Sequence, residues 1–220
     1  MTAFADCRFV VVDVETTGTS HGTGDRVTEV AAVVVERGDV TDAFQSLVNP
    51  GRPIPPRITA LTGISNAMVA GAPAFHEIAD ALSRTLEART FVAHNAPFDW
   101  GFLTMEFARA GRPEVLAAAL AGAPLCTVRL ARRLLAHLPR RNLDSVAHHY
   151  GVEIESRHRA LGDARATARV LLGLLRDLGP HGVDTLDGLH RWLASRAVAA
   201  RARRSALPRW VNDRGLGPGA

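Results

Sequence analysis

Runs of apolar residues, separated by stretches rich in glycine and proline, divide the first part of the chain into short elements. Three runs have the apolar and β-branched content of strands: FVVVDVE at 9–15, VTEVAAVVVERG at 27–38 and VTDAFQSLVNP at 40–50. The turn Arg37-Gly38-Asp39 between the second and third runs suits a tight hairpin. The sequence therefore predicts one strand and then an antiparallel hairpin, followed by a Pro-rich loop, NPGRPIPPRITALTGI.

Helical spacing becomes prominent after this loop. Segment 73–88 has apolar residues on one helical face, namely Phe75, Ile78, Ala79, Leu82 and Leu86. A short buried strand is predicted at 90–95, and the helix after it begins at a proline and ends at a glycine, over 97–111. Further helical patterns cover 127–138, 142–150 and 160–178. A hairpin combined with strand–helix units predicts an α/β layered fold with helices on both sides of the sheet.

Two acidic residues interrupt the first and most hydrophobic strand. Because alternate side chains of a strand point the same way, Asp13 and Glu15 share one face, with Cα atoms ~6.5–7 Å apart. Like charges this close repel, and burying them costs free energy unless a cation accompanies them. Either the strand ends at Val12 and both acids are hydrated, or the acids form part of a cation site.

Other polar residues also occur at the ends of predicted elements. Asn95 and Asp99 follow the strand at 90–95, while His158 and Asp163 lie at the start of the last helix. Each has a structural alternative, because Asn95 can cap a helix, first-turn acids are favoured by the helix dipole, and His158 can be a surface histidine. Asp13 and Glu15 also lie at the end of an element, and an α/β sheet can bring such element ends to one edge.

Four carboxylates gathered at one edge suit hard cations such as Mg²⁺, which prefer oxygen ligands and share them with phosphates. A pair of such ions activates water and stabilises an in-line phosphoryl displacement. A base for the attacking water is the remaining requirement, and histidine suits that role. The sequence therefore predicts metal-assisted phosphoryl chemistry.

Three segments, DVETTG, HNAPFD and HRALGDA, resemble the exonuclease motifs of DEDDh 3′→5′ exonucleases, the family of the proofreading epsilon subunit of bacterial DNA polymerase III. The similarity continues through ITALTGISNAMV and LCTVRLARRLLAHLPRRNLDSVAHHYGV, so it covers about residues 8–178. It implies a ribonuclease H-like fold, a five-stranded mixed sheet with helices on both faces. The catalytic residues that the resemblance implies are Asp13, Glu15, Asp99, His158 and Asp163.

The resemblance also implies a role for each of these residues. Asp13 would contact both of two divalent cations, Mg²⁺ or Mn²⁺, and Glu15 and Asp163 would complete the more tightly bound site. Asp99 would hold the second cation through water, and His158 would take the proton from the attacking water.

Substrate-binding positions carry over from the same motifs. Thr16 and Thr17 would bind the terminal nucleotide and its 3′-OH through their backbone and hydroxyls. Leu61 would wedge against the last bases, and Asn95 and Phe98 would line the pocket.

The implied activity is hydrolysis of phosphodiester bonds from the 3′ end of single-stranded or frayed DNA, releasing nucleoside monophosphates during proofreading or repair. A DNA polymerase is a further expected partner. Two alternatives stay open: an exoribonuclease that trims RNA 3′ ends, and a non-catalytic subunit that binds a polymerase or nucleic acid. The intact set of five catalytic residues favours an enzyme over the second alternative.

Charge is distributed unevenly along the 220 residues. Residues 181–220 hold seven arginines and three acids, a net charge of +4, and the whole chain also has a net charge of +4, so residues 1–180 balance to zero. We therefore expect an exonuclease domain at 1–180 and a basic, Arg-rich extension at 181–220. For this extension we favour disorder over a nucleic-acid-binding arm, and a helix that docks on a partner through Trp192 and Trp210 is a further alternative.

Composition adds the expected compartment. The chain has no apolar run of the ~20 residues that a bilayer span needs, and MTAFADCRFV lacks the features of a secretory signal. Cys7 and Cys126 fit no metal-binding spacing. We expect a cytoplasmic protein with reduced thiols and no membrane partner.

Overall fold

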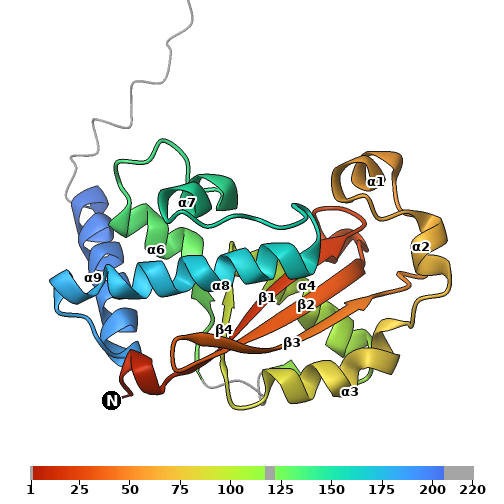
Figure 1. Cartoon of the computed structure of the whole chain (residues 1–220), viewed down its shortest axis with the longest axis horizontal. Coiled ribbons are helices and arrows are strands. Elements are labelled where there is room, and N and C mark those ends of the chain that lie inside the picture. The colour runs from red at the N-terminus through yellow and green to blue at the C-terminus, as the bar shows by residue number, and fades with distance from the viewer. Residues whose placement is uncertain (1, 117–121, 206–220) are drawn as a thin grey trace, which may run out of the picture.

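A five-stranded mixed sheet forms the centre of the computed structural model, which describes residues 2–116 and 122–205 (Figure 1). The strand order is β3-β2-β1-β4-β5, with β2 antiparallel to β1 and β3, and β4 parallel to β1 and β5. The strands are β1 Arg8–Thr16, β2 Val27–Glu36, β3 Asp39–Leu47, β4 Thr90–Ala93 and β5 Leu125–Cys126. The predicted five-stranded fold is confirmed, although the sequence patterns did not locate the fifth strand, β5, whose two residues are too few to form a pattern.

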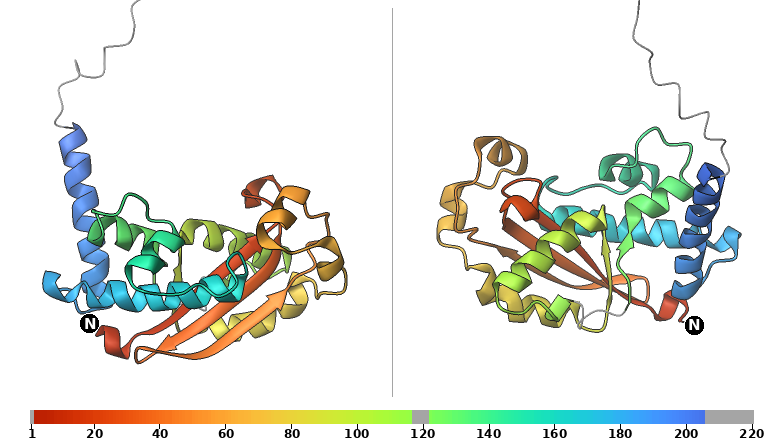
Figure 2. Two further views of the ribbon diagram at one scale, coloured as in Figure 1. Left: turned by 45° about the horizontal axis from the view of Figure 1, so that its top comes forward. Right: turned by 180° about the vertical axis from the view of Figure 1, so that it is seen from behind.

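Helices cover both faces of this sheet. Figure 1 shows α8 crossing one face, and the reverse view in Figure 2 shows α4 on the other. The first face also packs against α6 and α7, and the second against α3. These helices are α3 Phe75–Leu86, α4 Ala96–Arg109, α6 Thr127–Leu134, α7 Leu143–His149 and α8 Ala160–Arg176.

The alternation of β1 distributes its side chains between two hydrophobic cores. Phe9 and Val11 belong to the core under α8, while Val10, Val12 and Val14 belong to the core with α3 and α4. Asp13 and Glu15 follow Phe9 and Val11 at intervals of two, so they point toward α8.

The expected Pro-rich loop contains two short helices, α1 Pro56–Thr62 and α2 Asn66–Ala70. Pro56 occupies the first turn of α1, where its missing N–H has no consequence, and the Ser65 side chain caps α2 by accepting from the Met68 N–H. Three further segments are single 3₁₀ turns, η1 Phe4–Asp6, η2 His21–Thr23 and η3 Gly179–His181.

The final helix, α9 Leu186–Ser205, corrects our expectation for the basic extension. The Leu186 N–H donates to the Thr2 carbonyl at 3.2 Å, Leu189 is fully buried, and the Arg133 guanidinium lies 3.5 Å from the centre of the Trp192 ring. The disorder that we expected at 181–220 therefore does not hold for residues 186–195, whose apolar side chains complete the core. Trp192 packs inward instead of serving as a free anchor, and Trp210 lies outside the described residues.

Among the described residues, no helix combines the length and the apolar character that crossing a bilayer requires.

Candidate active site

Acidic side chains from three elements meet beside the carboxyl ends of β1 and β4. Asp13 and Glu15 come from β1, Asp99 from the first turn of α4 and Asp163 from the first turn of α8. Ligand atoms of Glu15, Asp163 and His158 all lie within 4.8 Å of one another. Asp99 is tied to the β1 backbone, because its Oδ1 accepts from the Val14 N–H at 3.2 Å.

Burial and mutual repulsion disfavour the charged forms of these acids. Burial raises the pKa of Asp13 well above its usual range, and the carboxylates of Asp99, Glu15 and Asp163 raise it further. Burial, together with the charges of Asp163 and Glu29, raises the pKa of Glu15 to about 7. Burial also raises the pKa values of Asp99 and Asp163. A cation between these groups would remove the repulsion that the arrangement creates.

Asp163 has a free coordination position. Its Oδ1 is buried and has no hydrogen-bond partner among the described residues, whereas its Oδ2 accepts from the Arg157 guanidinium and from the His158 N–H at 3.2 Å. An unpaired buried carboxylate oxygen is costly without a ligand. Carboxylate oxygens are also the donors that Mg²⁺ and Mn²⁺ prefer, so these residues fit such an ion.

The loop that carries His158 is anchored on both sides of the histidine. On one side, the Arg157 Nε donates to Asp144 Oδ1 at 2.8 Å. On the other side, Arg159 makes two hydrogen bonds of 3.0 and 2.8 Å with the fully buried Glu29. His158 itself has a φ of 61°, in the left-handed region that a non-glycine residue occupies only when its surroundings hold it there.

A pocket of about 280 Å³ opens in front of the acids. Its lining includes Asp13 and Asp163, together with His94, Asn95, Val128, Arg141, Asn142, Leu143 and Arg157. Asn95 has a φ of 80° and precedes α4, which turns the chain sharply between β4 and Asp99. His94 is held by Thr127 and the Arg141 carbonyl at 2.8 and 3.1 Å, and its burial lowers its pKa to about 4.

Four of the predicted substrate-binding residues do not belong to the lining of this pocket. The Thr16 hydroxyl donates to the Gly18 carbonyl at 2.5 Å, and the Thr17 hydroxyl donates to Asp25 at 3.2 Å, so both hydroxyls hold the turn after β1. Leu61 is 54% exposed on α1, and Phe98 packs against the Phe102 ring. Of the predicted substrate-binding residues, the structure thus brings Asn95 to the pocket beside the acids.

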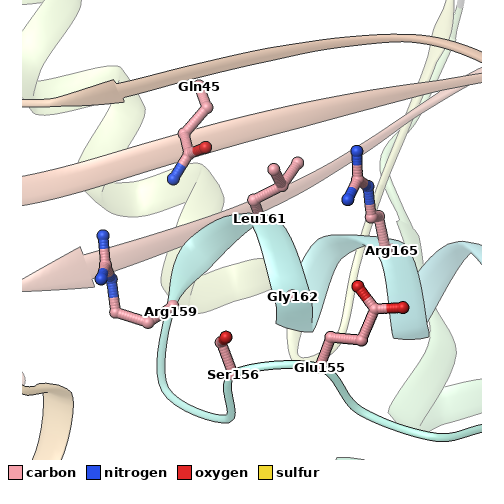
Figure 3. A pocket seen from close by; sticks show the side chains of 7 residues that line it. All are labelled: Gln45, Glu155, Ser156, Arg159, Leu161, Gly162 and Arg165. Atoms are coloured by element: carbon pink, nitrogen blue, oxygen red, sulfur yellow. The ribbon is translucent and has the colours of Figure 1, made fainter.

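A second pocket, of about 210 Å³, is lined in part by Glu155, Ser156 and Arg159 of the loop that carries His158 (Figure 3). Gln45 borders it from β3, Arg159 borders it from the position just before α8, and Arg165 extends from α8 itself. It contains none of the predicted catalytic residues. Gln45 and Arg159 both hydrogen-bond Glu29, so this wall of the pocket supports the anchor of the loop.

The family model described as Exonuclease matches residues 10–171, from the first core residues of β1 to the interior of α8. The chain belongs to the exonuclease family. Every acid of the site lies within the matched region.

Two curated relatives and one solved structure are similar to this exonuclease domain. The chain is 37% identical to the 3′-5′ exonuclease DinG of Bacillus subtilis over 186 residues, which are 84% of this chain and 19% of DinG. It is 42% identical over 186 residues to a DNA polymerase III subunit epsilon-like protein of Rhodobacter capsulatus, covering 82% of this chain and 25% of the relative. Exonuclease X in complex with 5′ overhanging duplex DNA shares 27% identity at a TM-score of 0.58, over 79% of this chain and 93% of that chain. The chain therefore spans a quarter or less of these two curated relatives.

Several residues of the exonuclease site were absent from our sequence prediction. Glu29 lies directly opposite Glu15 in the β1–β2 register, and an acid among the apolar residues of VTEVAAVVV could have indicated a buried ion pair. Arg157 is adjacent to His158, yet its contact with Asp144 depends on how α7 lies against the loop. His94 and Arg141 join the pocket only through tertiary packing.

Gly162 allows the His158 loop to approach the first turn of α8 in this exonuclease domain. A Cβ at position 162 would lie 1.7 Å from the Glu155 carbonyl oxygen, which is backbone and cannot rotate away. We expect Gly162→Ala to displace the loop and cost about 1–3 kcal/mol of unfolding free energy, with a loss of nuclease rate. Gly71→Ala, which meets nothing within 4 Å, is the matched control for denaturation and rate measurements. Equal stability and rate in both variants would contradict this account of the loop.

The raised pKa of Glu15 predicts how stability depends on pH when divalent ions are chelated. Since the folded pKa of about 7 exceeds the ordinary value of 4.5, protonated Glu15 stabilises the fold below pH 4.5, and this contribution is lost as the pH rises toward 7. Because the pKa of His94 is lowered to about 4, the contribution of His94 makes the fold more stable as the pH rises from about 4 to 6.5, opposite to that of Glu15. The pH dependence of the parent's stability therefore does not isolate Glu15.

Glu15→Gln isolates the contribution of this one carboxyl group. In EDTA, its advantage in unfolding free energy over the parent should grow between pH 4.5 and 7, by up to about 3 kcal/mol. Urea denaturation of both proteins across this range is the measurement. A difference that stays constant with pH would show that Glu15 is charged throughout.

Proposed function

We propose that this domain is a two-metal-ion 3′→5′ exonuclease that removes nucleoside monophosphates from single-stranded or frayed DNA. The observation that carries the proposal is that Glu15 and Asp163 meet beside His158 while the charges of Asp99, Glu15 and Asp163 act on Asp13. One buried oxygen of Asp163 is unpaired among the described residues. Divalent cations would stabilise the charged forms of acids that repel one another at one edge of the fold. The family membership supports the same conclusion.

Asp13, Glu15, Asp99 and Asp163 would hold the two ions, Mg²⁺ or Mn²⁺. Bound ions of this kind activate water and neutralise the charge that develops on the phosphate. The charges of Asp99, Glu15 and Asp163 all act on Asp13, which supports a role for Asp13 in holding the ions. Asp99 is fixed through the Val14 N–H, so its carboxylate keeps one orientation.

His158 would accept the proton of the attacking water. Its ring lies next to Glu15 and Asp163, and its backbone N–H is held by Asp163 Oδ2, so ring and acids keep a constant relation. Histidine is the side chain that most often takes this role in general base catalysis. The two anchors, Asp144 with Arg157 and Glu29 with Arg159, would limit its movement.

The pocket beside the acids would take the terminal nucleotide. Asn95 and Arg141 border it and offer polar contacts, and the exposed side chain of Leu61 on α1 is available to stack against a base. For Thr16 and Thr17, whose hydroxyls are engaged in the turn, the backbone is the more suitable contact. DNA is the substrate that we favour over RNA, because the names of the epsilon-like relative and of the Exonuclease X complex both refer to DNA.

We propose a DNA polymerase as the partner, on the basis of the epsilon-like relative and of the PolC-type DNA polymerase III of Bacillus cereus. The latter is 34% identical over 203 residues, which are 92% of this chain and 14% of the relative.

The substrate is tested by parallel digestion of single-stranded DNA, duplex DNA and RNA of one sequence with Mg²⁺. We expect the highest kcat/KM on single-stranded DNA, and none on any substrate with Asp13→Ala. Faster digestion of RNA would favour an RNA-trimming role.

A further inference from the structure

Arg157 connects the acidic site to a carboxylate outside it. Its Nε lies 2.8 Å from Asp144 Oδ1 and its Nη2 lies 3.5 Å from Asp144 Oδ2, while its Nη1 contacts Asp163 Oδ2. The side chain of Asp144 is 55% exposed and that of Asp163 is 4% exposed. One guanidinium therefore bridges a hydrated carboxylate and a buried one.

This guanidinium is a permanent positive charge among the metal-binding acids. Arginine does not lose its proton in proteins, so the charge is present at every working pH. Arg157 lines the same pocket as Asp13 and Asp163, and its charge acts on Asp13, Glu15 and Asp163 in the direction opposite to burial.

A divalent ion and Arg157 would draw on the same carboxylate. Of the two Asp163 oxygens, Oδ2 is occupied by Arg157 and the His158 N–H, and Oδ1 has no partner among the described residues. An ion bound at Oδ1 would share the charge of this carboxylate with Arg157 and would weaken the contact at Oδ2. The second contact, with Asp144, gives the guanidinium a partner that it keeps when the first is lost.

We propose that Arg157 is a built-in counter-cation, which stabilises the acidic site in the metal-free protein and competes with the divalent ion for Asp163. Asp144 lowers the cost of that exchange by holding the released guanidinium. The inference rests on the metal site of the proposed function. Arg157 and Asp144 are positioning residues in this account, and their effect is on ion affinity.

The proposal is tested without any turnover by measuring Mn²⁺ binding to the 220-residue chain. Binding is detected as the loss of the electron paramagnetic resonance signal of free Mn²⁺. Arg157→Gln should bind Mn²⁺ roughly tenfold more tightly than the parent, because the competitor is gone. Its melting temperature in EDTA should be lower, since the acids lose their counter-charge.

Asp144→Asn should act in the opposite direction. Without its second partner, the guanidinium remains on Asp163, so Mn²⁺ should bind roughly two- to fivefold more weakly than to the parent. In the double variant Arg157→Gln/Asp144→Asn, affinity should return to that of Arg157→Gln, because Asp144 acts through Arg157. Arg165→Gln changes an exposed arginine on α8, the helix that carries Asp163 (Figure 3); it is the matched control and should bind Mn²⁺ as the parent does.

Arg157→Lys provides a second variant if the glutamine substitution prevents folding. Lysine keeps the charge but lacks the planar fork of donors with which Arg157 contacts both carboxylates, so the Mn²⁺ affinity of this variant should lie between those of the parent and Arg157→Gln. Unchanged or weaker Mn²⁺ binding in the Arg157 variants, with normal binding in the parent, overturns this inference and leaves the proposed function intact. A parent that binds no Mn²⁺ overturns both.

Discussion

Asp13→Ala is expected to lower the rate of nucleotide release by at least about 10³-fold while the protein stays folded. Asp13 is the acid on which the charges of Asp99, Glu15 and Asp163 all act, so its loss removes the centre of the proposed ion site. The same change relieves repulsion, and the metal-free variant should melt at a temperature equal to or above that of the parent. The measurements are kcat on a single-stranded oligonucleotide and melting curves in EDTA.

Alanine at each of the other three acids, Glu15, Asp99 and Asp163, is expected to have the same consequence. Mg²⁺ should raise the melting temperature of the parent, because it binds the folded state, and this effect should be absent in Asp13→Ala. Asp39→Ala, at an exposed acid that begins β3, is the matched control and should keep parental activity. Near-parental turnover in any one of the four variants would contradict the assignment of its acid to the metal site.

His158→Gln is expected to lose a factor of roughly 10²–10⁴ in kcat and to keep Mn²⁺ binding. The ring lies beside Glu15 and Asp163 in a loop held at both sides, which suits a base, and we expect the four carboxylates to hold the ions without it. The acidic limb of the parental pH–rate profile should disappear in the variant, since the group that must lose its proton has been removed.

His148→Gln provides the control for this histidine, because His148 is exposed near the end of α7. It should retain the parental rate and the parental acidic limb. If His158→Gln retains both as well, another group accepts the proton. A loss of Mn²⁺ binding in His158→Gln would instead make the histidine part of the ion site.

Patterns of a few residues account for what could be predicted about the site. The alternation of β1 predicted that Asp13 and Glu15 share one face, and in the structure this face is the one under α8. The approach of Asp163 to that face depends on how α8 crosses the sheet, and the hydrophobic periodicity of the sequence does not reveal this packing. The family resemblance supplied that connection.

Errors in the prediction have identifiable physical reasons. The helix α9 has apolar residues at Leu186, Leu189 and Leu193, a helical spacing, but the arginines around it favoured an interpretation as a disordered extension. The helices α1 and α2 are too short to show periodicity and lie among prolines. Arg157 and Glu29 have their roles through partners distant in sequence, Asp144 and Arg159, and single-sequence patterns do not reveal such pairs.

Product analysis of one labelled strand tests the central claim most directly. A 5′-labelled single-stranded oligonucleotide, incubated with the parent and Mg²⁺, should shorten one nucleotide at a time from its 3′ end and release nucleoside monophosphates. EDTA should stop the reaction, and Asp13→Ala should leave the strand intact. Immediate release of the 5′ label, or equal digestion in the presence of EDTA, would contradict a metal-dependent 3′→5′ exonuclease.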